Sequence, residues 1–210
     1  MKKQKTTLIV ANGTMPKRSV LNKVISGINY IICADGGANH ARRMKLQPDV
    51  IIGDLDSITY KTKKYFSQVP IIFDGDRNST DLEKAIHYCV QNKLKSIVVI
   101  GATGDRIDHT IGNVGCFKKF SGKVNIKMVD PSGELSLITK KLKVVNATGR
   151  TISLIPIDKC KGVSTKNLKY KLKNDVLELG SKEGTSNKAI SDVVTVTIKS
   201  GFLLLYVTHR

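Results

Sequence analysis

The sequence contains no tryptophan, and only 5% of its 210 residues are aromatic. Few side chains are therefore available for ring stacking. Long apolar runs are missing too, because the longest, GFLLLYV at residues 201–207, is far shorter than the roughly 18 residues that span a bilayer. The apolar stretch near the N-terminus, LIVA, is shorter than the about 7 to 15 residues of a secretory signal. We expect no membrane segment and a cytoplasmic protein.

Paired cysteines and two nucleotide-binding motifs are also absent. The four cysteines form no CxxC pair, so a disulfide framework or a zinc site has little support, and we expect buried, reduced thiols. The sequence has no GxxxxGK[ST], which excludes a P-loop kinase. It has no strand followed by GxGxxG, so dinucleotide redox chemistry lacks its usual motif.

Acidic residues are scarce, and their positions are uneven. The chain has 35 Lys and Arg against 17 Asp and Glu, a formal net charge of +18. This excess favours polyanionic partners such as nucleotides or nucleic acid, or a solvated surface. Before residue 120 all the acids lie between Asp35 and Asp108, mostly in the stretches DGG, GDLDS, DGDRNSTD and GDRIDH. We interpret this clustering as a sign that these acids belong to a functional site.

The first part of the chain alternates short apolar runs with helix-like segments. Residues 81–92 have apolar side chains at helical spacing, and Thr80 with Glu83 forms a capping box for this helix. Apolar strands alternating with amphipathic helices indicate an α/β domain with a mainly parallel, Rossmann-like sheet. The expected strands are residues 6–11, 30–34, 49–53, 70–73, 96–100 and 124–129.

The second part changes character after the turn sequence DPSG at residues 130–133. Helical periodicity disappears, and short strand-like runs follow at residues 134–139, 141–147, 151–157, 175–180, 192–198 and 202–208. This pattern predicts an all-β antiparallel sandwich or barrel. We therefore expect two domains, residues 1–125 and 130–210, with the boundary near residues 121–135.

Four polar motifs each follow an apolar run: DGGANH, DLDSI, DGDRNSTDLEK and GATGDRIDH. If the runs are parallel strands, every motif lies at the carboxyl end of its strand and on the same edge of the sheet. Open α/β sheets bind ligands at that edge. We expect these four loops to converge on one site.

The stretch GDLDSI offers metal ligands. Asp54 and Asp56 at positions i and i+2 of an extended segment would point the same way, and Asp81 and Asp35 can add further oxygens. Mg²⁺ binds through a few carboxylates together with substrate phosphates. We predict that Asp54, Asp56 and Asp81 hold a metal beside a nucleotide. The alternatives are an aspartyl phosphatase for the DxD pattern and a simple turn or helix cap for any one acid.

Glycine loops supply candidate phosphate contacts. The GATG stretch at residues 101–104 precedes a helix expected to begin near Asp108, so backbone N–H groups can face phosphate, although a tight turn explains the glycines equally well. Lys17 and Arg18 can neutralise phosphate charge or be solvated surface. The candidate nucleotide-binding residues are Asn12, Gly13, Asp35, Gly36, Gly101, Thr103, Gly104 and Arg106.

Taken together, these motifs resemble those of thiamine pyrophosphokinase. The resemblance rests on ADGGANH (34–40), GDLDSI (53–58), STDLEKAI (79–86), GATGDRIDHTIGN (101–113), NLKYKL (167–172) and GTSN (184–187), and it covers nearly the whole chain. It implies transfer of pyrophosphate from ATP to the hydroxyl of thiamine, giving thiamine diphosphate and AMP. It also implies Mg²⁺, an ATP- and metal-binding first domain, a thiamine-binding β-sandwich, and a homodimer with active sites between subunits.

The resemblance assigns roles to individual residues. It makes Asp54, Asp56, Asp81 and Asp108 catalytic, the first three as metal ligands. The implied thiamine-binding residues are Asp81, Asp108, His109, Tyr170, Ser186 and Asn187. Tyr170 stands where some members have Trp to stack on the vitamin, and Asn167 stands where Gly is usual. Tyr170 can also simply pack in a strand.

Two rival functions remain at this point. A pterin pyrophosphokinase would use the same ATP and metal edge with another acceptor, but NLKYKL and GTSN favour thiamine. A nucleic-acid-binding protein would explain the charge, yet no RNP, KH or helix-turn-helix signature appears, and clustered carboxylates repel phosphates. We expect no nucleic acid partner. In pyrophosphate transfer, catalysis is largely positioning and charge neutralisation, with Asp81 or Asp108 as acceptor of the hydroxyl proton.

Overall fold

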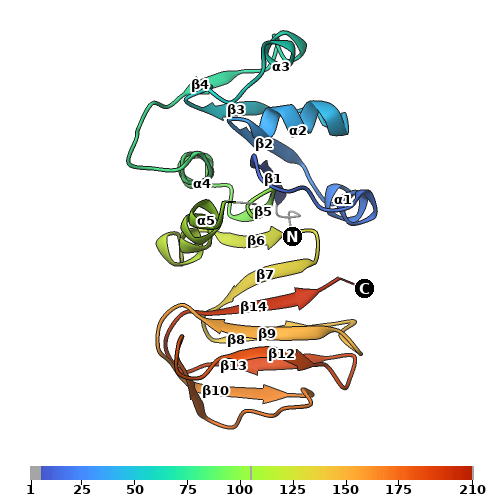
Figure 1. Ribbon diagram of the computed structural model, residues 1–210, viewed down its shortest axis with the longest axis vertical. Helices are drawn as coiled ribbons and strands as arrows, with labels where there is room; N and C mark the ends of the chain where they lie inside the picture. The colour runs from blue at the N-terminus through green and yellow to red at the C-terminus, as the bar shows by residue number, and fades with distance from the viewer. Residues whose placement is uncertain (1–5, 105, 210) are drawn as a thin grey trace. The chain divides into compact units, whose positions relative to one another are not determined.

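The computed structural model describes residues 6–104 and 106–209. The chain divides into two compact units, Met1–Pro131 and Ser132–Arg210, and each is described by itself (Figure 1). The strands of the first unit are β1 (Thr6–Val10), β2 (Tyr30–Ala34), β3 (Val50–Gly53), β4 (Ile71–Phe73), β5 (Ser96–Ile100) and β6 (Asn125–Val129). Its helices are α1 (Arg18–Ile25), α2 (Gly37–Met44), α3 (Tyr60–Tyr65), α4 (Asp81–Gln91) and α5 (Ile107–Lys119).

The strands of the first unit form a parallel sheet in the order β6, β5, β1, β2, β3, β4. Helices α1 and α2 lie on one face and α4 and α5 on the other (Figure 1). The central strand β1 is covered on both sides, with Leu8, Ile9 and Val10 fully buried. Because β2 and β5 pair with opposite sides of β1, the winding direction reverses there, which is the place where doubly wound sheets bind ligands. The prediction of an α/β unit with a mainly parallel sheet is confirmed.

Helix α4 begins where its sequence predicts. The Oγ1 atom of Thr80 accepts a hydrogen bond from the backbone N–H of Glu83 at 3.2 Å, which caps the first turn. The apolar face of the helix buries Leu82, Ala85 and Ile86 against the sheet. Burial of a leucine or isoleucine side chain contributes about 1.5–3 kcal/mol, so this face fixes the helix and the loop before it.

Helix α2 approaches the sheet more closely than a side chain would permit. A Cβ atom at Gly37 would lie 1.9 Å from the carbonyl oxygen of Val10, at the end of β1. The first turn of α2 therefore rests directly on β1, and this contact fixes the turn that joins β2 to α2 at Asp35 and Gly36.

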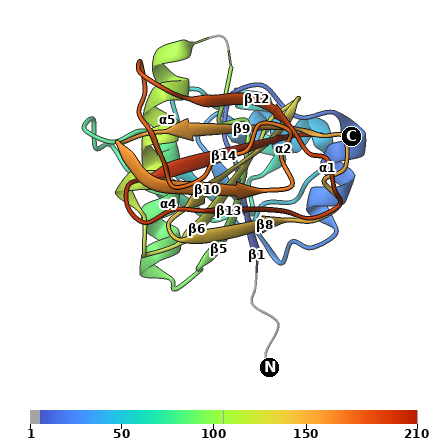
Figure 2. The same ribbon diagram turned by 90° about the horizontal axis from the view of Figure 1, so that it is seen from below.

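The second unit is built from β-strands. They are β7 (Gly133–Ile138), β8 (Lys141–Val144), β9 (Thr151–Pro156), β10 (Cys160–Lys166), β11 (Asp175–Leu177), β12 (Gly184–Lys188), β13 (Val194–Thr197) and β14 (Leu203–Thr208). Strands β12, β9, β14 and β7 are antiparallel neighbours in one sheet, and β11, β10, β13 and β8 in the other. Figure 2 shows β12, β9 and β14 side by side, and β10, β13 and β8 side by side. One apolar core joins strands of both sheets, and it includes Leu154, Leu205, Val163 and Val196. The expected antiparallel sandwich is confirmed.

Two strands of this unit were not predicted from the sequence. Strand β10 reads CKGVSTK and β12 reads GTSNK, so neither has the apolar content that identifies a strand. Their buried positions include the polar residues Thr165 and Asn187. At these two interior positions the buried side chains are polar and form hydrogen bonds with the backbone of Leu172 and of Tyr170.

The cysteines agree with the expectation of buried, reduced thiols. All four cysteines are free and buried, and burial raises the pKa of Cys89 and of Cys116 to about 12. In the described residues, every helix is too short or too polar to cross a bilayer.

A pair of glycine substitutions tests the contact of α2 with β1. Gly37→Ala should lower the free energy of unfolding by about 2 kcal/mol or more, because its methyl group would meet a backbone atom that cannot give way. The matched control is Gly115→Ala in α5, where nothing lies within 4 Å of the added Cβ. The control should raise stability by about 0.5–1 kcal/mol, since alanine is the better helix former. Urea unfolding of both variants checks this, and equal stability would contradict the close packing.

Candidate active site

Loops after several strands meet at the carboxyl edge of the parallel sheet. The backbone N–H of Gly13, after β1, donates to the carbonyl of Gly101, after β5, at 2.8 Å. The backbone N–H of Asp35, after β2, donates to the carbonyl of Ile52 in β3 at 2.8 Å. The first bond joins the loops after β1 and β5, and Gly36, after β2, lies against Asn12, after β1. The three loops therefore form one connected rim at the switch point of the sheet.

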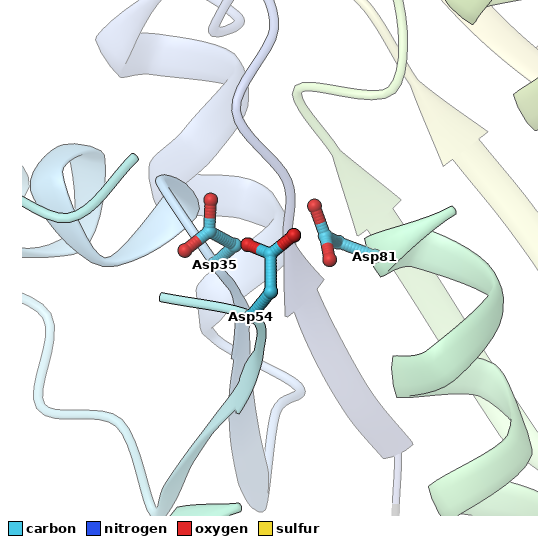
Figure 3. A group of neighbouring side chains, drawn as sticks. All are labelled: Asp35, Asp54 and Asp81. Carbon is cyan, nitrogen blue, oxygen red and sulfur yellow. The ribbon is translucent and has the colours of Figure 1, made fainter. Parts of the chain in front are cut away.

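Three carboxylates converge on this rim. Asp35 follows β2, Asp54 follows β3, and Asp81 opens α4. One carboxylate oxygen of each lies within 4.8 Å of the other two, and Figure 3 shows the three side chains next to one another. Among the described residues, these three carboxylates lie close enough together to share a metal ion. We call these three residues the acid cluster.

Gly53 makes room for the acid cluster. A Cβ atom there would lie 2.8 Å from the Cβ of Asp35 and 3.2 Å from Oδ1 of Asp81, and the residue has φ +149°. The glycine directly before Asp54 is thus required by the approach of the other two acids.

Asp56 lies outside the acid cluster. The expectation of an extended DLDSI segment is wrong, because Leu55 has the left-handed φ of +66°. The chain turns between Asp54 and Asp56, so the two side chains do not share one direction. The backbone N–H of Asp56 donates to Oδ1 of Asp54 at 3.3 Å, and its carboxylate accepts from the Ser57 hydroxyl at 2.8 Å. A metal-binding role for Asp56 stays a prediction.

The chemistry of the acid cluster fits a divalent cation. The side chain of Asp35 is 2% exposed, and in the described part of the chain its Oδ1 has no hydrogen-bond partner. A buried carboxylate oxygen without a partner costs free energy, which a cation would recover. Its Oδ2 accepts from the backbone N–H of Ser57 at 3.3 Å, which fixes the direction of the carboxylate.

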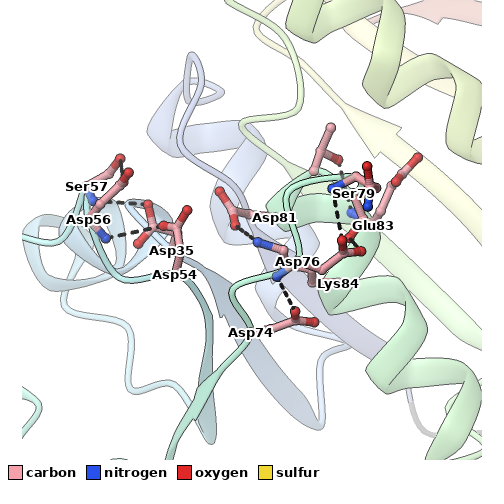
Figure 4. Close-up of polar contacts among 12 residues, drawn as sticks. Asp35, Asp54, Asp56, Ser57, Asp74, Asp76, Ser79, Asp81, Glu83 and Lys84 are labelled. Carbon is pink, nitrogen blue, oxygen red and sulfur yellow. Dashed lines mark hydrogen bonds and ion pairs between the residues drawn. The ribbon is translucent and has the colours of Figure 1, made fainter.

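Lys84 forms a buried ion pair with a member of the acid cluster. Its side chain is 3% exposed, and its Nζ lies 3.2 Å from Oδ1 of Asp81, one helical turn away (Figure 4). Burial raises the pKa of Asp81 above its ordinary value; the adjacent Lys84 opposes this shift, and the charges of Asp35 and Asp54 add to it. Burial and the neighbouring charges therefore disfavour the ionised form of Asp81, and Lys84 offsets this only in part.

The acids before α4 build its entry loop. Asp74 accepts from the backbone N–H of Asp76 at 3.0 Å, and Asp76 accepts from the backbone N–H of Asn78 at 2.9 Å (Figure 4). Asp76 also accepts from the Ser79 hydroxyl at 2.6 Å, and this bond, with the one from Asn78, lowers the pKa of Asp76. These acids have the turn-forming role that single loop aspartates commonly have.

The glycine loops contact each other closely. A Cβ atom at Gly13 would lie 2.2 Å from the carbonyl oxygen of Thr103, and one at Gly36 would lie 2.4 Å from Nδ2 of Asn12. The N–H of Gly104 donates to the Thr110 hydroxyl at 3.3 Å. These contacts bring the candidate ATP-binding residues of three loops together, while the N–H groups of Gly13 and Gly104 are already engaged within the protein.

Arg106 and Asp108 form an exposed pair at the start of α5. The guanidinium donates from Nη2 at 2.5 Å and from Nε at 3.2 Å, and these hydrogen bonds lower the pKa of Asp108 to about 2. The neighbouring His109 is exposed. None of the three belongs to the acid cluster.

The candidate thiamine-binding residues of the second unit form a group of their own. Asn187 is 5% exposed and holds the backbone of Tyr170 on both sides: its Oδ1 accepts from the N–H at 3.0 Å, and its Nδ2 donates to the carbonyl at 2.6 Å. The Tyr170 ring is exposed, with the ammonium of Lys169 5.4 Å from its centroid. The N–H of Ser186 donates to the Ser153 hydroxyl at 3.0 Å. Tyr170 is thus not packed in a strand.

Asn167 has a physical reason to stand where glycine is usual in the resembling family. Its φ is +65°, a left-handed conformation that asparagine tolerates better than most residues with a side chain. Its Nδ2 donates to the carbonyl of Val193 at 2.8 Å. Asn167 thus holds a left-handed conformation that glycine also adopts readily.

Sequence reasoning missed two residues that organise the rim. Asn39 in α2 donates to the carbonyl of Ser57 at 2.8 Å and accepts from the N–H of Thr59 at 3.1 Å, which ties down the loop after Asp54. Lys84 was overlooked although it follows Asp81 at the i, i+3 spacing of a helical ion pair. The i, i+3 spacing could have identified Lys84 from the sequence. For Asn39 the only indication in the sequence was its place in the motif ADGGANH.

Two family models match the chain in sequence order. Residues 21–129 match "Thiamin pyrophosphokinase, catalytic domain", and residues 137–203 match "Thiamin pyrophosphokinase, vitamin B1 binding domain". The first match contains the acid cluster, and the second contains Tyr170 and Asn187.

Individual proteins agree with these matches. Thiamine pyrophosphokinase 1 of Oryza sativa subsp. japonica is 30% identical over 204 residues, which are 82% of this chain and 76% of the relative. The crystal structure of thiamine pyrophosphokinase from Bacillus subtilis superimposes with a TM-score of 0.87 at 24% identity, covering 98% of this chain and 100% of the other. The structure of the enzyme from Candida albicans also gives a TM-score of 0.87, at 19% identity, covering 99% and 90%. Fold and sequence agree: the chain belongs to the thiamine pyrophosphokinase family.

Proposed function

We propose that this protein transfers the pyrophosphoryl group of ATP to the hydroxyl of thiamine, giving thiamine diphosphate and AMP. The observation that carries the proposal is the acid cluster at the switch point of the parallel sheet, within the part of the chain that matches the family's catalytic domain. A sheet edge that gathers carboxylates beside glycine loops suits a nucleotide together with a divalent cation.

The acid cluster would hold Mg²⁺ through Asp54 and Asp81, with the buried Oδ1 of Asp35 as a further oxygen. When bound, this ion would neutralise charge on the phosphates of ATP. The protein itself contributes the direction of each carboxylate, which the Ser57 N–H fixes for Asp35 and Lys84 fixes for Asp81.

The glycine loops would receive the rest of the nucleotide. Asn12, Gly13 and Gly36 lie beside the loop of residues 101–104, so these residues border one stretch of the rim. Arg106 has an exposed guanidinium close to this loop in sequence, and it would bind phosphate oxygens.

The reaction also needs an acceptor for the hydroxyl proton. The thiamine oxygen bonds to the β-phosphorus, the bond from that phosphorus to the α,β-bridging oxygen breaks, and AMP leaves. Asp81 is committed to Lys84 and the cation, which leaves Asp108. While Arg106 lowers the pKa of Asp108 to about 2, this carboxylate is a poor base. A shift of Arg106 to phosphate would restore the basicity of Asp108.

Thiamine would bind with its rings against Tyr170, in the part of the chain that matches the vitamin B1 binding domain. The ring is exposed, and a cationic thiazolium can replace the Lys169 ammonium near its face. Asn187 would act through the Tyr170 backbone that it holds, and Ser186, Asp81, Asp108 and His109 complete the proposed set. A homodimer with active sites between subunits and a cytoplasmic location belong to the same proposal.

The reaction itself is the first test. Incubated with ATP and Mg²⁺, the protein should form AMP when thiamine is added and none in its absence. Omission of Mg²⁺ should abolish the reaction. Chromatography of the nucleotides measures AMP, and mass spectrometry identifies thiamine diphosphate. AMP formation with a hydroxymethyl pterin in place of thiamine would instead identify the other pyrophosphokinase.

Substitution of single acids tests the metal site. Asp54→Asn should lower kcat by at least about 100-fold, because the developing phosphate charge loses its counter-cation. It should leave the melting temperature unchanged or higher, because one of three repelling charges is gone. Asp56→Asn should cost much less activity, since its carboxylate accepts from the Ser57 hydroxyl and lies outside the acid cluster. Equal losses in the two variants would assign Asp56 to the metal as well.

Tyr170 can be tested through the affinity for thiamine. Tyr170→Ala should raise the KM for thiamine about tenfold, the loss expected for one stacking contact, with little change in the KM for ATP. Tyr170→Trp should keep or lower the KM, because indole is the stronger cation–π partner. Leu179→Ala, at another exposed apolar residue of the second unit, is the control. An unchanged KM in Tyr170→Ala would remove Tyr170 from the vitamin site.

A further inference from the structure

Lys84 is an unusual lysine because its charge is almost completely buried. The residue is 5% exposed, and its side chain is 3% exposed. Lysine is rarely buried to this extent unless it is paired, because removal of an ammonium group from water is costly. It forms an ion pair with Asp81, at 3.2 Å, and Asp81 belongs to the acid cluster.

The acid cluster needs a positive charge even before any ligand arrives. Three carboxylates with oxygens within 4.8 Å of one another repel strongly in a partly buried setting. Within residues 6–104 and 106–209, Lys84 is the cation that forms an ion pair with any of them. Its ion pair within the cluster is with Asp81, so Asp54 and Oδ1 of Asp35, which has no hydrogen-bond partner among the described residues, remain open to a second cation.

We propose that Lys84 is a positioning residue that acts as a built-in counter-cation and weakens the binding of free metal ions. This inference rests on the proposed metal site. A divalent cation entering the cluster must share Asp81 with the ammonium, and it meets a net charge of two negatives instead of three. Nucleotide phosphates add the missing negative charge and ligand oxygens, so the metal binds firmly only together with ATP.

A purely structural lysine would behave differently. If the ion pair only stabilised the first turns of α4, its loss would lower the melting temperature and leave metal affinity unchanged or weaker. If Lys84 competes with the metal, its neutralisation makes the empty cluster more negative and frees Asp81. The affinity for a free divalent cation then increases. The direction of the change separates the two roles.

The experiment is a titration of the purified protein with Mn²⁺ in the absence of nucleotide, with free Mn²⁺ measured by electron paramagnetic resonance. Lys84→Met and Lys84→Gln should bind Mn²⁺ at least about tenfold more tightly than the wild type, and Lys84→Arg should stay close to the wild type. In the neutral variants, ATP should enhance Mn²⁺ binding less than it does in the wild type. Circular dichroism checks that each variant is folded. If Lys84→Met does not fold, Lys84→Gln still tests the proposal, because glutamine keeps a hydrogen-bond donor for Asp81.

Lys119→Met is the matched control. Lys119, at the end of α5, pairs with Glu83 of α4 at 2.9 Å and lies outside the acid cluster, so this variant loses one positive charge and one ion pair of α4. Its Mn²⁺ affinity should equal that of the wild type. Unchanged or weaker Mn²⁺ binding in both neutral Lys84 variants overturns the role of Lys84 while the proposed function stands. A wild type that binds no Mn²⁺ even with ATP overturns the metal site and this inference together.

Discussion

Electrostatic repulsion among three carboxylates is the constraint to which the first unit is adapted. Asp35, Asp54 and Asp81 come from three separate loops, and no local preference of the chain would gather them. The parallel sheet does so, because it places the ends of β2 and β3 and the start of α4 along one edge. Gly53 and the left-handed Leu55 then permit the approach. Each of these features costs stability that the buried strands must offset.

The two units achieve order around their candidate sites by different means. In the first unit, buried apolar strands provide rigidity, and the polar groups are confined to the rim. In the second unit, a buried asparagine fixes an irregular segment: Asn187 replaces the missing strand partner of Tyr170 with two side-chain hydrogen bonds. An exposed aromatic ring on a firmly held backbone is well suited to binding, since little conformational freedom is lost when a ligand stacks on it.

Much of this arrangement could be predicted from the sequence, because it follows from local patterns. Apolar runs located the strands of the parallel sheet, and Thr80 with Glu83 located the start of α4. Convergence of the loops followed from strand polarity alone. The left-handed conformation of Leu55 could not be foreseen, since leucine rarely adopts it. The predicted direction of the Asp56 side chain was therefore wrong. Strand β12 and the hydrogen bonds of Asn187 depend on contacts between distant segments, which no local pattern records.

The raised pKa of Asp81 shows that placing this carboxylate in the acid cluster lowers the stability of the fold when the group is ionised. Its carboxyl has a higher pKa in the folded protein than in the unfolded chain, chiefly because of burial. The folded state therefore holds its proton more tightly, so the contribution of Asp81 to stability is favourable below the unfolded value and is lost as pH rises through the folded one. At neutral pH the ionised acid destabilises the fold, and Lys84 reduces this cost only in part. Under the proposed metal binding, a cation at the acid cluster would remove the remainder, so that stabilisation of the fold and assembly of the site would result from the same binding event.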